Sequence, residues 1–156
     1  MNKLGDLSCN EFLTELASAA PAPGGGGGAA MAGALAAALA SMVANLTIGK
    51  EKFADREPEV KELLEQAEAE RVRLLTLVDE DAAVFNSFMS CYKLPKTTDE
   101  EKAARTAAIR AAAKQAATVP LNIARSSFAV LKLADRLANV TYSCSNSNET
   151  NSHMRK

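Results

Sequence analysis

The chain has 156 residues, 47% of them hydrophobic, and its 18 basic and 19 acidic side chains give a formal net charge of −1. This length and hydrophobic content are typical of one folded domain with its own core and exclude a disordered chain. The balanced charge and the aromatic content of only 4% argue against a nucleic-acid-binding surface, which needs basic patches or stacking rings.

The cysteines, Cys9, Cys91 and Cys144, are widely spaced and form no CxxC pair. The sequence therefore predicts neither a zinc site nor a disulfide framework, and we expect no metal ion. Residues 1–6 do not lead into the hydrophobic core of a signal peptide. These observations predict a cytoplasmic protein with reduced thiols.

A capping box opens the first predicted helix, because Ser8 is followed three residues later by Glu11. The helix must end before Pro21, since a residue that precedes proline is pushed out of the α region. Residues 24–28, all glycine, then precede a long apolar helix. A glycine loop at a helix N-terminus is a ready anion site. It is not a nucleotide P-loop, because no Lys-Ser/Thr pair follows it.

Residues 29–48 carry no charge and are long enough to span a membrane. Alanine dominates this segment, and alanine gains little from lipid. We therefore expect a helix buried on most of its faces inside the protein, with a membrane-embedded hairpin as the alternative. Gly33, Ala37, Ser41 and Asn45 recur at four-residue steps and form a small-residue face on which another helix can pack closely. If Asn45 is buried, it needs a hydrogen-bond partner.

The next predicted helix, residues 58–92, carries an apolar stripe with heptad-like spacing. Two charged residues, Arg71 and Asp81, interrupt this stripe, while Asp79 and Glu80 lie off it and are expected in solvent. A carboxylate on an apolar face must be paired, or its pKa must rise. Asp81 is therefore either a structural hydrogen-bond acceptor or a functional acid. The stripe consists of Val60, Leu64, Ala67, Arg71, Leu74, Val78, Asp81, Phe85, Phe88 and Tyr92.

Two further helices are predicted before residue 138. The first follows a capping box at Thr98 and Glu101 and runs to about Ala117. The second runs from Pro120 to about Leu137, because a proline interrupts the pattern between them. We expect its apolar residues to point inward: Leu121, Ala124, Phe128 and Leu131.

After residue 138 the chain is rich in Ser, Asn and Thr and lacks periodicity. The sequence predicts a helical domain over residues 1–138 and a polar, disordered tail over residues 139–156. His153, the only histidine, lies in this tail and is a poor catalytic candidate. The predicted fold class is all-α, an up-down helical bundle of about five helices with a buried Ala/Gly-rich central helix.

Several separated motifs occur in one order along the chain: residues 21–26 (PAPGGG), 29–30, 32–34, 41–50 (SMVANLTIGK), 79–82 (DEDA), Phe85, 93–96 (KLPK), Arg105 and 120–121. In this combination, over about residues 7–137, they resemble the cyclodeaminase/cyclohydrolase family of folate enzymes. Several motifs in the right order are far more specific than a lone glycine motif.

The resemblance implies an all-α homodimer that performs one-carbon folate chemistry without a bound cofactor, with a tetrahydrofolate derivative as its substrate. One branch is formiminotetrahydrofolate cyclodeaminase, a lyase of histidine degradation. It closes the formimino group onto a second folate nitrogen, expels ammonia and forms methenyltetrahydrofolate. A sister branch hydrolyses methenyltetrahydrofolate to formyltetrahydrofolate. Some members are fused to a formiminotransferase domain, so a separate formiminotransferase is an expected partner here.

The chain departs from the family pattern in two places. Gly27 and Gly28 stand where the family usually carries Ser and a β-branched residue. Family members also continue into a loop and further helices where residues 139–156 form the polar tail, so we expect a C-terminally truncated member. A catalytically inactive protein that keeps only the dimer surface is therefore a competing hypothesis.

The acid/base of either reaction must be Asp, Glu, Lys, Tyr or water, because the predicted folded part has no histidine. Our hypothesis is that Asp81 is the general acid/base, since burial raises a carboxyl pKa toward neutrality. Lys93 is the second catalytic candidate, with a role as a helix C-terminal cation as the alternative. The candidate substrate-binding residues are Gly24, Gly25, Gly26, Asn45, Lys50, Lys96 and Arg105, of which Asn45 and Lys50 are expected to line the same cleft as the glycines.

Overall fold

The computed structural model describes residues 3–153, and the side chains of residues 3–142. This part of the chain is helical and contains no strand, which confirms the all-α prediction. The α-helices are α1 (Cys9–Leu16), α2 (Gly24–Thr47), α3 (Glu57–Cys91), α4 (Asp99–Ala116) and α5 (Thr118–His153), and the short 3-10 helices are η1 (Leu4–Asp6) and η2 (Glu51–Arg56). Both predicted capping boxes, at Ser8 and at Thr98, are formed.

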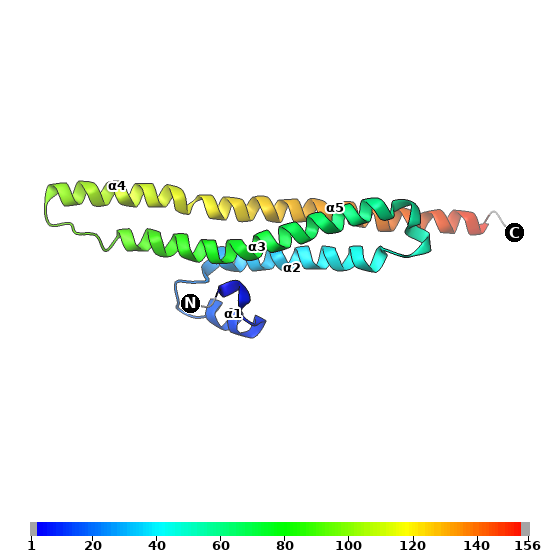
Figure 1. Cartoon of the computed structure of the whole chain (residues 1–156), viewed down its shortest axis with the longest axis horizontal. Helices are drawn as coiled ribbons and strands as arrows, with labels where there is room; N and C mark the ends of the chain where they lie inside the picture. Colours follow the sequence, from blue (N-terminus) through cyan, green and yellow to red (C-terminus); the bar gives the residue numbers. More distant parts are fainter. Residues whose placement is uncertain (1–2, 154–156) are drawn as a thin grey trace.

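The four long helices make an up-down bundle, as predicted (Figure 1). Helix α3 runs antiparallel to α2, and α4 and α5 follow one another in a single line that returns along α3. The break between α4 and α5 is one residue long, at Ala117. Pro120 lies in the first turn of α5, where a missing N–H removes no helical hydrogen bond. Helix α1 packs beside the start of α2.

One face of α2 is buried, and this corrects the expectation that most of its faces would be. The buried face packs on α3 and α5 and consists of Gly27, Ala30, Gly33, Ala34, Ala37, Ala40, Ser41, Ala44 and Thr47. The opposite face exposes Leu35, Leu39, Met42 and Leu46. The reason is geometric, because α3 and α5 cover α2 from one side of the bundle only.

The small-residue face of α2 lies inside the bundle from Gly33 to Ser41, whereas Asn45, predicted on the same face, is exposed. A side chain at Gly33 would meet Leu74 of α3 and Ser127 of α5. Two four-residue steps further along, the Ser41 hydroxyl donates a hydrogen bond of 2.6 Å to Glu68. Arg71 also binds Glu68, with an N–O distance of 2.7 Å. This ion pair accounts for one of the two charges that interrupt the stripe of α3.

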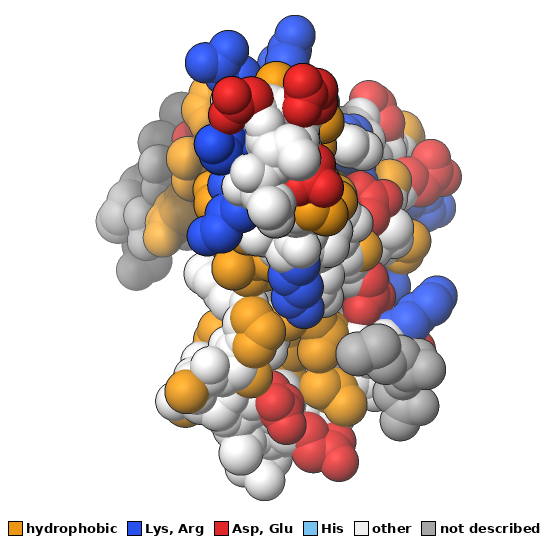
Figure 2. Space-filling model, turned by 90° about the vertical axis from the view of Figure 1, so that its left-hand side faces the viewer, with side chains coloured by type: hydrophobic (Ala, Val, Ile, Leu, Met, Phe, Trp, Pro, Cys, Tyr) orange, Lys and Arg blue, Asp and Glu red, His pale blue; other side chains and the backbone are white. Residues whose placement is uncertain are grey.

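The hairpin formed by the end of α3 and by α4 contains no buried residue. The last buried residue of α3 is Val78, and α4 has none. The hairpin extends beyond the start of α2 at one end of the molecule (Figure 1). Seen from that end, basic and acidic side chains gather in the upper part of the surface, and hydrophobic side chains are exposed below them (Figure 2).

Helix α5 turns the opposite face inward from the one predicted. Leu121, Phe128 and Leu131 are exposed, and the buried residues are Val119, Ile123, Ser126, Val130, Leu133, Leu137 and Val140. The helix carries two apolar stripes, and each satisfies the same periodicity. Burial of the second stripe also carries the helix past its predicted end at Leu137. The division of the chain at residue 138 stays a prediction, and the side chains of Cys144 and His153 lie outside the described part.

Candidate active site

The glycines 24–28 form the first turn and a half of α2 rather than a loop before it. Each glycine in a helix interior costs about 1 kcal/mol relative to alanine. Contacts with other parts of the fold must therefore stabilise the helical conformation of these glycines. Side chains at Gly26, Gly27 and Gly28 would meet, respectively, Asp81, Pro23 with Val78, and Leu16. The start of α2 is therefore a close-packed junction between α1 and α3.

Asp81 lies on α3 directly beneath this junction. Its carboxylate fills the space that a Cβ at Gly26 would need. Burial raises the pKa of the Asp81 carboxyl above its usual value, and a hydrogen bond from the backbone N–H of Gly27 partly opposes that shift. The acid thus holds its proton at a higher pH than an exposed aspartate does.

The surroundings of Asp81 suit proton transfer. The first N–H groups of a helix lack intrahelical acceptors and carry the positive end of the helix dipole. Gly24, Gly25 and Gly26 supply such groups at the start of α2. The Asp81 carboxylate lies against Gly26, and nothing lies within 4 Å of the positions that side chains at Gly24 and Gly25 would take. A substrate held on these donors would place its reacting nitrogen or carbon close to an acid of raised pKa. Of the two hypotheses for Asp81, this arrangement favours the functional one.

Asn45 and Lys50 lie at the opposite end of α2. An α-helix rises about 1.5 Å per residue, so Asn45 is about 30 Å from Gly24. Both Asn45 and Lys50 are exposed. Within one chain they therefore do not share a cleft with the glycines, because the intervening α2 is a continuous helix. The four-residue spacing placed Asn45 on one face of the helix, and the family motif suggested Lys50, but neither gives a distance from the glycines.

The remaining candidates gather at the turn between α3 and α4. Lys93 and Lys96 are exposed there, and the end of α3 is about 15 Å from Asp81 along the helix axis. The structure therefore does not bring Lys93 and Asp81 together. Arg105 of α4 donates a hydrogen bond of 3.3 Å to the carbonyl oxygen of Tyr92, and its guanidinium lies 5.6 Å from the centre of the Tyr92 ring. It thus fastens α4 to the end of α3.

Sequence reasoning missed the role of Asp79, which was expected in solvent. Its carboxylate accepts a hydrogen bond of 2.7 Å from the backbone N–H of Leu4. The N-terminal segment is thereby anchored two residues away from Asp81. No periodicity signals such a contact, because its donor is a backbone group 75 positions away in sequence.

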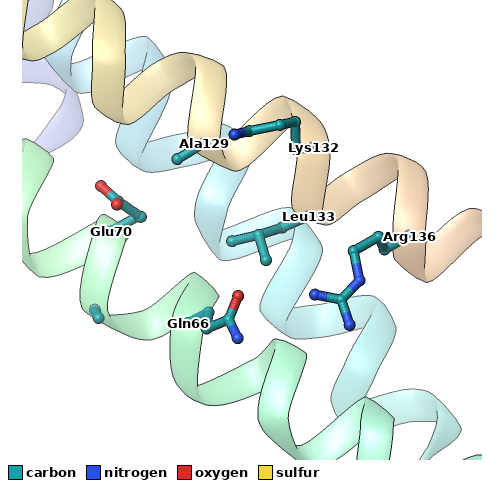
Figure 3. A pocket seen from close by; sticks show the side chains of 7 residues that line it. Gln66, Glu70, Ala129, Lys132, Leu133 and Arg136 are labelled. Carbon is teal, nitrogen blue, oxygen red and sulfur yellow. The ribbon is translucent and has the colours of Figure 1, made fainter.

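Two cavities lie away from Asp81. One of about 360 Å³ separates α3 from α5, and Figure 3 shows Gln66 and Glu70 on one side of it and Lys132 and Arg136 on the other. A second of about 350 Å³ lies between α1 and α2 and is lined largely by apolar side chains, among them Leu13. Across the described residues, no three His, Cys, Asp or Glu side chains come together as metal ligands do.

Comparison with known proteins links this geometry to one family. A sequence model described as formiminotransferase-cyclodeaminase matches residues 8–149. The chain is 48% identical over 134 residues to a methenyltetrahydrofolate cyclohydrolase of Methylorubrum extorquens, a match that covers 86% of this chain and 64% of the relative. It is 40% identical over 121 residues to a formimidoyltransferase-cyclodeaminase of Rattus norvegicus, covering 78% of this chain and 22% of that relative.

A solved structure agrees with these matches. The crystal structure of formiminotetrahydrofolate cyclodeaminase from Thermotoga maritima superposes with a TM-score of 0.63 and 28% identity, covering 94% of this chain and 80% of that chain. The chain spans less than two thirds of the length of the cyclohydrolase and about a fifth of that of the rat protein.

Proposed function

The chain belongs to the formiminotransferase-cyclodeaminase family, and from that membership we propose that it acts on a one-carbon derivative of tetrahydrofolate. The first candidate activity is formiminotetrahydrofolate cyclodeaminase, which forms methenyltetrahydrofolate and ammonia. The names of the rat relative and of the Thermotoga maritima structure support this activity. The observation that carries it is the half-buried carboxyl of Asp81 at the open N-terminus of α2.

Asp81 has the properties that the cyclodeaminase reaction requires. A second folate nitrogen attacks the formimino carbon, and the bond from that carbon to its original imino nitrogen then breaks. The departing nitrogen must gain protons to leave as ammonia, and an acid of raised pKa next to it can donate one. The free N–H groups of Gly24, Gly25 and Gly26 would orient the substrate through its acceptor atoms.

Methenyltetrahydrofolate cyclohydrolase is the second candidate activity. The 48% identity to a protein of that name favours it. In this reaction Asp81 would act as its ionised form and take a proton from the water that adds to the methenyl carbon. Both activities therefore assign proton transfer to the same residue.

The same proposal extends to the oligomeric state, the cellular location and the metabolic pathway. We propose a cytoplasmic homodimer that needs no bound cofactor and acts as a lyase in histidine degradation. Five of the relatives carry a formimidoyltransferase in their name, which supports a separate formiminotransferase as the source of the formimino substrate. The uncharged outer face of α2 supports the homodimer, because monomers rarely expose large apolar patches.

One absorbance assay separates the alternatives. Methenyltetrahydrofolate is followed after the protein is given either the formimino compound or the methenyl compound. Formation of the chromophore from the first identifies a cyclodeaminase, and its loss from the second identifies a cyclohydrolase. If folded protein shows neither change, and calorimetry detects no folate binding, the chain is the catalytically inactive member.

A further inference from the structure

Phe85 of α3 lies one helical turn beyond Asp81 on the same face of the helix. Side chains four positions apart on a helix have their Cβ atoms about 6 Å apart. Because α3 runs antiparallel to α2, the residues after Asp81 continue beyond the start of α2 (Figure 1). The first N–H groups of a helix point away from its body, past the N-terminus. Phe85 therefore lies beside the space into which the glycine N–H groups of α2 point.

Four side chains of α3 neighbour Asp81 at spacings of three and four residues, and they differ in their access to solvent. Leu77 and Val78 are buried, and Val84 packs against the apolar core. Phe85 is 38% exposed. A ligand in contact with Asp81 can therefore lie against Phe85 without displacing the core.

The ring of Phe85 is free to take a second ring. Among the residues with described side chains, no aromatic ring or cation lies over it. Tyr92, by contrast, already has two partners, because its ring centre is 5.3 Å from that of Phe88 and 5.6 Å from the guanidinium of Arg105. A lysine ammonium lies 5.0 Å from the ring centre of Phe128. Of the rings on α3 after Asp81, only that of Phe85 is thus left without such a partner.

The substrate class of the proposed function carries rings at the required place. In tetrahydrofolate derivatives the reacting carbon lies between two nitrogens, one in the reduced pterin and the other attached to an aminobenzoyl ring. When that carbon is at the Asp81 carboxyl, a ring system comes within the distance of about 6 Å that separates Asp81 from Phe85. Aromatic pairs attract one another at centroid separations of about 4.5–7 Å.

We propose that Phe85 binds an aromatic ring of the folate substrate and so holds the reacting carbon against Asp81. Met89, which is 44% exposed one turn further along the same face, extends this surface, and its thioether packs well on rings. The inference rests on the proposed function, because the folate supplies the ring. It assigns binding to Phe85 and leaves proton transfer to Asp81.

A tryptophan at position 85 reports the contact directly. The chain contains no tryptophan, so Phe85→Trp introduces a single emitter. Addition of 5-formyltetrahydrofolate, a stable reduced folate, should shift its emission to shorter wavelength and protect it from acrylamide quenching, because the bound ring excludes water. Phe128→Trp is the matched control, since Phe128 is 60% exposed on α5, and it should show neither change.

Binding measurements test the role of the ring. In calorimetry, Phe85→Ala should bind 5-formyltetrahydrofolate about ten-fold more weakly than the wild type, whereas Phe85→Tyr, which keeps the ring, should stay within about two-fold. Phe128→Ala should bind as the wild type does. If the wild type is active, Phe85→Ala should raise KM more than it lowers kcat, because a ring held equally in the ground state and the transition state contributes uniform binding. Circular dichroism shows whether each variant keeps its helices.

The outcomes separate this inference from the proposed function. If the wild type binds the reduced folate, an unshifted emission of the Phe85→Trp variant overturns the role of Phe85 and leaves the proposed function standing. Unchanged binding by Phe85→Ala, or an equal loss of binding in Phe128→Ala, does the same. A folded wild type that binds no reduced folate refutes the proposed function and this inference together.

Discussion

The carboxylate of Asp81 occupies the space in which a side chain at Gly26 would stand. We expect Gly26→Ala to displace Asp81 and abolish turnover while the helix content stays unchanged. Overpacking costs about 1–3 kcal/mol, and the better helix propensity of alanine offsets about 1 kcal/mol of this. Thermal unfolding and the methenyltetrahydrofolate assay measure the two effects. A fully active Gly26→Ala variant would show that the position of Asp81 is unimportant.

Asp81→Asn should separate stability from activity. The pKa of Asp81 in the folded state is raised above its ordinary value of 3.8, so the carboxyl favours the fold while protonated. This contribution is complete below pH 3.8 and is lost as the pH rises through the raised pKa. The neutral asparagine should therefore be relatively more stable at pH 7 than at pH 4, yet nearly inactive. Unfolding in urea at the two pH values provides the check, and turnover within a few-fold of wild type rules out the acid/base role.

Replacement of glycine by alanine should lower the free energy of unfolding at Gly33 and raise it at Gly25, although both glycines lie in α2. Gly33→Ala brings a methyl group to 2.8 Å from the Ser127 hydroxyl and 3.2 Å from Leu74, and we expect a loss of about 1–3 kcal/mol. Gly25→Ala meets nothing within 4 Å and should gain about 0.5–1 kcal/mol. Urea unfolding of both variants measures the difference. Equal effects would mean that α2 does not pack as closely on α3 and α5 as described.

Removal of one buried hydroxyl should stabilise the chain. Ser126 is 2% exposed, and its Oγ has no hydrogen-bond partner. A buried polar group without a partner costs about 1–3 kcal/mol, and alanine also has the higher helix propensity. Ser126→Ala should therefore raise the free energy of unfolding by about 1 kcal/mol or more. Chemical denaturation tests this, and a clear loss of stability would reveal a hidden partner for the hydroxyl.

Arg105 should act on α4 rather than on substrate. Arg105→Ala removes the hydrogen bond to the Tyr92 carbonyl oxygen and the contact with the Tyr92 ring. Amide hydrogen exchange should become faster throughout α4, while folate binding stays within about two-fold of wild type, or about 0.4 kcal/mol. Arg110→Ala, an exposed position of the same helix, is the matched control. A large loss of binding with unchanged exchange would instead support the original assignment of Arg105 to the substrate.

Periodicity predicted the long helices and singled out Asp81, because both depend on local spacing. A carboxylate on an apolar stripe stands out in any sequence, and here it meets the start of α2. The same spacing could not tell which of the two stripes of α5 faces inward, since Phe128 and Val130 satisfy helical periodicity equally well. The family motifs, for their part, suggested that Lys50 lines the same cleft as the glycines, because motifs give an order along the chain and not a distance in space.

The start of α2 was mistaken for a loop for a related reason. Intrinsic preference disfavours a helix of glycines, and only the contacts with Leu16, Val78 and Asp81 select it. Those contacts come from α1 and α3, so no local property of residues 24–28 reports them. Sequence therefore singled out Asp81 as a candidate acid but did not predict the packing of residues 24–28 beside it.

The hairpin formed by the end of α3 and by α4 buries no residue. We therefore expect it to unfold separately from the core of the bundle. Segments with few buried contacts open with small free energies, while core segments exchange only on global unfolding. The outer part of α3 should then fray and reclose many times while Val78 and its neighbours stay folded. The turn with Lys93 and Lys96 would sample a wide range of positions within the lifetime of a folded chain, and proteolysis should begin there.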